Sequence, residues 1–284
     1  MAQKPEKHAT RVPTVLIGIG GIGGQIVRLV DNELKNYDKQ FVRMLVLDTN
    51  TNDLSKLDKT NIPYVQTSEN MTVSDYLRRN KRFEDWFPYN PLLNGKNLIE
   101  GAGQVRSVSR LGALASEAAG RFEKIKNAIT EVSRNVGSTI HKTVRVMIVG
   151  SVCGGTGSGM GIQLPFLVRD MIDEISNMPN AIIRGLFIMP DIVEEVQDTD
   201  QKRRSVYVNG TYCVCDGTEK QCFPTPSIHR LRRGLPGYLI LFAPHAFEPE
   251  RQLLSSKPPS PLVFFLISTH FTATLGIPLA SPAL

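Results

Sequence analysis

The chain of 284 residues lacks long runs of basic residues and an unbroken apolar segment of membrane-spanning length. Lysine and arginine exceed aspartate and glutamate by only six, so no nucleic-acid partner is expected. The first eleven residues are polar and contain no apolar core, so no secretory signal peptide is expected there. The apolar stretch at 260–280 is interrupted by His270 and Pro278, and we therefore expect no membrane anchor.

Cysteine is also scarce, with four residues in the whole chain. Three of them, Cys213, Cys215 and Cys222, lie within ten residues, and no secretory signal precedes them. We therefore expect no disulfide framework, and we expect the protein to be located in a reducing compartment, the cytoplasm. A zinc site at these cysteines needs a fourth ligand, for which His229 is the only nearby candidate, so we do not favour one.

The residues that are present have the composition of a globular protein, with 41% hydrophobic and 21% charged residues. Short apolar runs typical of buried parallel strands alternate with segments of helical period. The expected strands cover 14–17, 41–47, 143–149 and 181–189, and the expected helices cover 25–34, 109–136 and 163–176. This order predicts an α/β fold, a doubly wound and mostly parallel sheet with helices on both faces.

A glycine-rich segment at 18–25 follows the first expected strand and contains the pattern G-x-G-x-x-G. Glycines let the backbone approach a phosphate closely, and the N-terminus of the next helix offers free N–H groups to an anion. Asp48 ends the second expected strand, roughly where a dinucleotide-binding fold places its ribose acid. An NAD-dependent oxidoreductase with a Rossmann domain is therefore one alternative.

Two more glycine-rich segments lie at 101–103 and 153–159. In the latter, Thr156 and Ser158 stand between four glycines, which predicts a nest of N–H and hydroxyl donors around a phosphate chain. No lysine follows the last glycine, so this is not a Walker A loop. A dinucleotide fold with one phosphate loop leaves both segments unexplained.

The run Gly-Gly-Thr-Gly-Ser-Gly at 154–159 resembles the G-G-T-G-[S/T]-G signature of the tubulin/FtsZ superfamily. In the same order, 20–25 is similar to the family's first phosphate loop, 48–50 to its second and 101–103 to its third. The resemblance covers about residues 13–214 and is closest to the bacterial tubulin-like proteins. It implies a tubulin/FtsZ-type nucleotide-binding domain.

The resemblance also implies GTP or GDP with Mg²⁺, and an asparagine early in the central helix that pairs with guanine. In this chain that residue is Asn209. The candidate nucleotide-binding residues are Gly20, Gly21, Ile22, Gln25, Asp48, Thr49, Asn50, Gly101, Ala102, Gly103, Gly154, Gly155, Thr156, Gly157, Ser158 and Asn209. The sequence departs from the family pattern at Asp48 and Asn50, which are exchanged, and at Gln104, which replaces an asparagine.

The sequence predicts a polar lead-in at 1–12, a tubulin/FtsZ-like GTP-binding domain at 13–216 and an irregular tail at 217–284. The tail carries ten of the 18 prolines, which remove backbone donors and break helices and central strands. This change of composition suggests a frameshifted, mis-spliced or truncated version of a longer protein. The family's second lobe, with the acidic loop that completes the active site of the next subunit, is not recognisable there.

We therefore expect a GTP-binding, tubulin/FtsZ-like protein whose partners are guanine nucleotide and, in head-to-tail cytoskeletal filaments, other copies of the chain. GTP hydrolysis is expected to be very low because the acidic loop is not recognised. The alternatives are the oxidoreductase described above and a nucleotide-free scaffold or inactive remnant.

Overall fold

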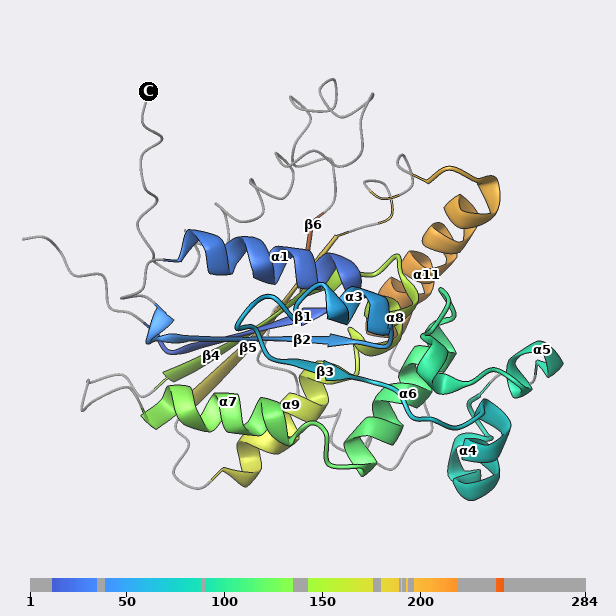
Figure 1. Ribbon diagram of the computed structural model, residues 1–284, viewed down its shortest axis with the longest axis horizontal. Helices are drawn as coiled ribbons and strands as arrows, with labels where there is room; N and C mark the ends of the chain where they lie inside the picture. Colours follow the sequence, from blue (N-terminus) through green and yellow to red (C-terminus); the bar gives the residue numbers. More distant parts are fainter. Residues whose placement is uncertain are drawn as a thin grey trace, which may run out of the picture.

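A computed structural model describes residues 12–34, 39–87, 90–134, 143–175, 180–188, 190, 193, 197–218 and 239–242. The described strands form one six-stranded sheet in the order β3-β2-β1-β4-β5-β6, and every neighbouring pair is parallel (Figure 1). The strands are β1 (Thr14–Ile19), β2 (Val42–Asp48), β3 (Tyr64–Gln66), β4 (Thr143–Ser151), β5 (Asn180–Ile188) and β6 (Leu239–Phe242). The predicted parallel α/β sheet is confirmed.

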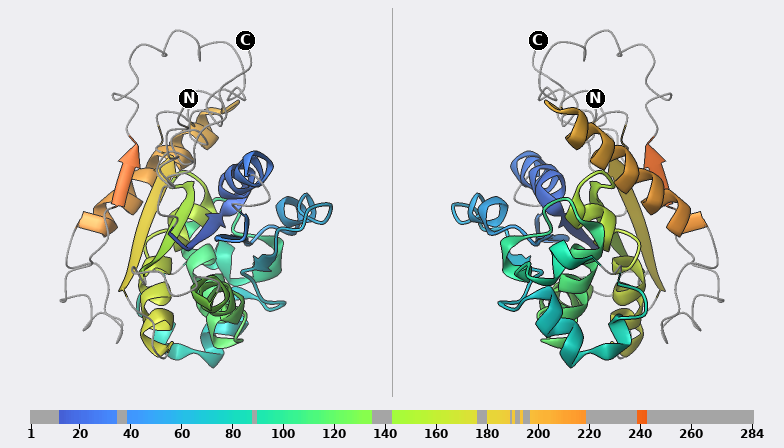
Figure 2. Two further views of the ribbon diagram at one scale, coloured as in Figure 1. Left: turned by 90° about the vertical axis from the view of Figure 1, so that its left-hand side faces the viewer. Right: turned by 90° about the vertical axis from the view of Figure 1, so that its right-hand side faces the viewer.

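The helices connect these strands. They are α1 (Gly20–Glu33), α3 (Thr51–Ser55), α4 (Val73–Arg79), α5 (Pro91–Asn94), α6 (Arg106–Ala118), α7 (Glu123–Arg134), α8 (Gly155–Met160), α9 (Leu164–Glu174) and α11 (Asp200–Thr218), with 3₁₀ turns η1 (Lys81–Phe83) and η2 (Leu98–Glu100). Figure 2 shows α11 and β6 on one flank of the sheet and α3 on the opposite flank.

Successive residues of a strand point to opposite sides of the sheet, so a strand that is apolar at every position makes both faces apolar. Helices cover both of these faces. Val15 and Ile17 of β1 belong to an apolar cluster that includes Ile125 of α7 and residues of α9. Leu16, between them, belongs to a second cluster with Val27 of α1. This alternation explains why β1 is apolar at nearly every position and buried throughout.

Three helix boundaries differ from the prediction. Helix α1 begins at Gly20 rather than at Gln25, and α8 begins at Gly155, within a segment expected to be a loop. The single helix expected over 109–136 is two helices, α6 and α7. The chain turns between them at Gly120, whose φ of +71° is in the left-handed region that ends helices, and Phe122 then enters the core.

Between β3 and the segment at 101–103, the chain forms α4, η1, α5 and η2. These pack against α6 around an apolar cluster of their own, which includes Tyr76, Leu98 and Leu111. In the tail, β6 pairs in parallel with β5, so residues 239–242 are regular where an irregular chain was expected. The other tail residues from 219 onward lie outside the described part of the chain.

Candidate nucleotide-binding site

The predicted site residues lie at the carboxyl ends of the central strands. Helix α1 begins directly after β1, residues 48–50 end β2, and α8 begins four residues after β4 (Figure 1). In open parallel sheets, ligands bind in the crevice outside these strand ends, where the chain connections diverge. The strand order places this divergence between β1 and β4, which are neighbours in the sheet.

The N-terminus of α1 opens toward this edge. Gly20 has a φ of +71°, which a residue with a side chain rarely adopts, and it turns the chain from β1 into the helix. Ile19 provides no side-chain cap, and the first turn contains no acidic residue. The helix therefore presents free N–H groups and the positive end of its dipole to the crevice. Ile22 packs in the apolar cluster beneath the helix, whereas Gln25 is exposed.

A chain of hydrogen bonds joins the segments at 48–50, 101–103 and 154–159. The Thr156 hydroxyl donates to Asp48 Oδ1 at 2.9 Å and lies 2.9 Å from the Thr49 hydroxyl. Thr49 Oγ1 in turn accepts the backbone N–H of Ala102 at 3.1 Å. Residues that are more than fifty positions apart in the sequence are thus fixed to one another at one place.

Burial raises the pKa of the Asp48 carboxyl above its ordinary value of 3.8, because desolvation disfavours the charged form. Hydrogen bonds from the Asn50 N–H and the Thr156 hydroxyl oppose this shift, and the nearby charge of Asp53 adds to it. Asp48 is only 2% exposed. It therefore holds the segments together and is not a freely solvated acid.

The segment at 101–104 has an unusual backbone. Gly101, Gly103 and Gln104 all have positive φ, at +84°, +54° and +63°. Gln104 is the one residue other than glycine in this region of φ within the described chain. Such consecutive turns orient backbone N–H groups toward a common point, a geometry that suits an anion.

The α8 segment is packed tightly against the other loops. A Cβ on Gly155 would lie 2.8 Å from Ala102 Cβ and 3.0 Å from Gln104 N, and a Cβ on Gly157 would collide with the Ser151 carbonyl oxygen. Gly154 differs, because no atom lies within 4 Å of its Cβ position. The Ser158 hydroxyl donates to the Gly154 carbonyl at 2.6 Å and so serves the helix itself.

Asn209 lies in the same region, although α11 is distant in the sequence. Its side-chain nitrogen donates to the carbonyl oxygens of Gln104 at 3.0 Å and Cys153 at 3.1 Å, and the residue is 5% exposed. Asn209 therefore connects α11 to the segment at 101–104 and to the residues just before α8. Whether it also contacts guanine stays a prediction.

Two residues that the sequence analysis did not select also belong to the site. Asp53 Oδ2 accepts the Asn50 side-chain N–H at 3.0 Å and lies 3.2 Å from the Cβ position of Gly21. Ser109 donates to the Thr156 carbonyl at 3.3 Å. Asp53 had a usable signal, since it lies in the first turn of a helix that Asn50 caps. No local pattern marks Ser109.

Within the described residues, no group of three histidine, cysteine, aspartate or glutamate side chains is placed to hold a metal ion. The cysteine side chains considered for zinc lie outside the part of the chain whose side chains are described. In the same described part, no helix is both long enough and apolar enough to span a membrane.

Comparison with solved structures shows a likeness to tubulin-like proteins at low sequence identity. CetZ1 from Haloferax volcanii, solved as a GDP-bound monomer, is 16% identical with a TM-score of 0.50, over 95% of this chain and 62% of that one. TubZ of Clostridium botulinum phage c-st is 14% identical with a TM-score of 0.48, over 94% and 60%. A GTPγS-form protofilament of TubZ from Bacillus thuringiensis serovar israelensis is 14% identical with a TM-score of 0.46, over 93% and 56%.

The chain thus spans about 60% of the length of these structures. No curated protein sequence gave a significant match. The profile of a family described as tubulin like, however, matches residues 15–214, which include every candidate residue at the carboxyl edge of the sheet. That range covers more than two thirds of the sequence, and the chain belongs to the tubulin-like family.

Proposed function

We propose that the carboxyl edge of the sheet binds GTP and GDP. The observation that carries this proposal is the hydrogen-bond chain from Asp48 through Thr156 and Thr49 to Ala102, which brings three phosphate-loop candidates together beside the open N-terminus of α1. Neutral N–H donors and a helix dipole suit a chain of phosphates. Membership of the tubulin-like family and the GDP reported for CetZ1 support a guanine nucleotide.

Asn209 is our candidate for guanine recognition. Its amide nitrogen is bonded to two backbone carbonyls, so the contact with the base would use the side-chain carbonyl oxygen, which accepts hydrogen bonds. Guanine offers N–H donors on its Watson–Crick edge, whereas adenine offers an unprotonated ring nitrogen at the corresponding position. A fixed acceptor therefore favours GTP over ATP.

The carboxylates of Asp48 and Asp53 fit a Mg²⁺ ion that is held mainly by phosphate oxygens and water. Such sites need only one or two carboxylates from the protein, and these two are joined through Asn50, whose backbone N–H donates to Asp48 and whose side-chain N–H donates to Asp53. When bound, the ion would neutralise charge on the phosphates. Both carboxylates already have partners, Asp48 Oδ1 in Thr156 and Asn50 and the Asp53 oxygens in Lys56 and Asn50, so the ion would take the place of some of these contacts.

We further propose that the protein self-assembles head to tail in the cytoplasm, where the buried thiol of Cys153, which donates to the Ile188 carbonyl, stays reduced. The protofilament form of the TubZ structure supports self-association. GTP hydrolysis by this chain is proposed to be very low, since no acidic loop is recognised in the sequence after α11.

The oxidoreductase alternative is not supported by the family match. It requires the Asp48 carboxylate to bind a ribose hydroxyl, but this group is 2% exposed and accepts the Thr156 hydroxyl. The second and third glycine-rich segments have no role in that function.

Calorimetry with GTP, GDP, ATP and NAD on the same preparation tests the ligand. We expect GTP and GDP to bind and ATP to bind more weakly. Binding of NAD without a response to GTP would overturn the proposal. Sedimentation and phosphate release as functions of protein concentration test assembly and hydrolysis, and a rate per subunit that rises with concentration would contradict the low hydrolysis proposed here.

A further inference from the structure

Lys96 is a cationic residue beside the third glycine-rich segment to which the sequence analysis gave no role. Its ammonium nitrogen lies 2.8 Å from the position that a Cβ on Gly103 would occupy. Gly103 therefore leaves the space that the end of the lysine side chain fills. On the other side of the same segment, Ala102 and Gln104 contact the beginning of α8 at Gly155. Lys96 thus reaches the segment that links the third and fourth phosphate-loop candidates.

The backbone that carries Lys96 is firmly held. The Lys96 N–H donates to the Leu93 carbonyl at 3.1 Å, and its carbonyl accepts the N–H of Val73 at 2.9 Å. Two residues later, Leu98 is 2% exposed in the apolar cluster of α4 and α6. The base of the side chain is therefore fixed at a position from which its ammonium group reaches Gly103.

The charge of Lys96 has no protein partner among the described residues, where no hydrogen bond or ion pair of its ammonium group is found. The carboxylates of the site are occupied otherwise, because Asp53 pairs with Lys56 at 2.5 Å and Asp48 accepts the Thr156 hydroxyl. The backbone donors of the loops are neutral. A triphosphate carries more negative charge than one Mg²⁺ ion neutralises, so a protein cation beside the neutral donors would stabilise it further.

We propose that Lys96 binds the terminal phosphate of a nucleoside triphosphate and makes the site prefer a triphosphate to a diphosphate. This inference rests on the proposed function. The Ala102 N–H is already bonded to Thr49, which leaves the Gly103 side of the segment and Lys96 to contact the terminal phosphate. In this arrangement a diphosphate, which lacks the terminal phosphate, would depend on the other segments for its binding.

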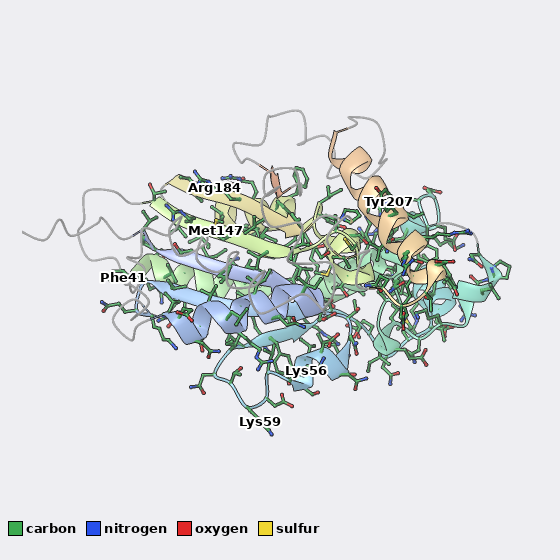
Figure 3. All side chains as sticks on the ribbon, turned by 90° about the horizontal axis from the view of Figure 1, so that it is seen from above. Phe41, Lys56, Lys59, Met147, Arg184 and Tyr207 are labelled. Carbon is green, nitrogen blue, oxygen red and sulfur yellow. The ribbon has the colours of Figure 1, made fainter. Side chains whose placement is uncertain are left out.

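The test compares Lys96→Met, which keeps the apolar stem and removes the charge, and Lys96→Arg with the wild-type chain. Lys59→Ala is the matched control, because Lys59 is exposed on the loop after α3 and projects away from the rest of the molecule (Figure 3). Calorimetry with GTP, GDP and inorganic triphosphate measures the three affinities. Urea unfolding of each variant shows whether the fold is retained.

We expect Lys96→Met to weaken GTP and inorganic triphosphate about tenfold or more, the size of one lost charge-assisted hydrogen bond, and GDP less than twofold. Lys96→Arg should restore most of the difference, and Lys59→Ala should match wild type. If wild-type chain binds GTP and Lys96→Met lowers GTP and GDP affinity equally or not at all, the role of Lys96 is refuted while the proposed function stands. If the wild-type chain binds inorganic triphosphate but not GTP, only guanine recognition is refuted. If it binds none of the three ligands, both the proposed function and the role of Lys96 are refuted.

Discussion

The beginning of α1 and the beginning of α8 are both built from glycines, but the space around those glycines differs. At α1, a Cβ on Gly20 or Gly21 would find its nearest neighbour at 3.4 or 3.2 Å, and for Gly21 that neighbour is the end of the Asp53 side chain. At α8, Cβ atoms on Gly155 and Gly157 would meet fixed backbone atoms of the 101–104 segment or of β4. Only Gly154, just before α8, is open.

This difference separates two reasons for glycine at the proposed phosphate-binding edge. The glycines inside α8 allow the helix to pack against neighbouring loops. Gly23 does the same for α1, because a Cβ there would lie 2.6 Å from the Val149 carbonyl oxygen. Gly154 is open, and the nearest atoms at Gly20 and Gly21 belong to side chains, so a ligand could approach the backbone at these three positions. A glycine-rich motif is therefore a mixture of packing positions and contact positions.

The largest expected effect tests the distinction directly, by adding one methyl group at a packed glycine and one at an open glycine. Gly157→Ala should destabilise the protein by about 3 kcal/mol or more, because the Cβ meets the Ser151 carbonyl and the backbone must move. Gly154→Ala should change the free energy of unfolding by less than about 0.5 kcal/mol, as at an open surface position. Urea unfolding measures both, and equal destabilisation would remove the distinction.

The next largest effect is expected at Asn209, which ties α11 to the α8 side of the site and not to α1. Asn209→Ala removes two buried hydrogen bonds and should cost about 2 kcal/mol, and Asn209→Asp should cost more because a carboxylate would face two carbonyl oxygens. Ser205→Ala on the same helix is the control, since its hydroxyl bonds only within α11. An Asn209→Ala variant as stable as the control would contradict the bracing role.

A smaller effect is expected on ligand affinity when the open position at Gly154 receives a larger side chain. Gly154 has a φ of −86° and a ψ of 166°, an extended conformation that valine adopts readily. Gly154→Val should therefore fold normally but weaken GTP about tenfold, because the branched side chain fills the space through which a phosphate approaches the backbone. Calorimetry with GTP measures this, and unchanged affinity would place the phosphates elsewhere.

The sequence was sufficient for four strands of the sheet and for the order of the site segments, but not for β6. The runs that became β1, β2, β4 and β5 are mostly apolar, because both sheet faces are covered, and this pattern is local. The division into α6 and α7 was missed because one glycine, Gly120, ends a helix in a stretch that otherwise favours helix.

The connections within the site could not be read from the sequence. The bond from Thr156 to Asp48 joins residues 108 positions apart, and the bonds of Asn209 depend on where α11 returns to the sheet. The motifs indicate which residues gather, but not which hydroxyl faces which carboxylate. For the same reason, the packing role of the α8 glycines became visible only when their neighbours were known.

The smallest expected effect concerns the pH dependence of the contact between β2 and α8. Burial raises the pKa of Asp48 in the folded protein above 3.8, so the unfolded chain releases this proton at lower pH than the folded chain. Between those two pKa values the folded state holds more protons, and stability falls as the pH rises. Above the folded pKa the full destabilisation is present. Asp48→Asn keeps an acceptor for Thr156 and carries no charge, so its stability relative to wild type should increase as the pH rises above 3.8.

Asp198→Asn provides a control of opposite sign for this measurement. The hydrogen bond from Lys202 lowers the pKa of Asp198, so this carboxylate stabilises the fold above its unfolded pKa and loses that contribution as the pH falls. Asp198 is exposed, and its effect should be small and screened by salt. Urea unfolding of the two variants and wild type should therefore give differences that run in opposite directions, in a series that extends from below pH 3.8, where the Asp198 contribution is lost, to pH 8. A stability difference for Asp48→Asn that does not change with pH would mean that the carboxylate is solvated in the folded protein, and the link between β2 and α8 would then be looser than the 2.9 Å bond to Thr156 indicates.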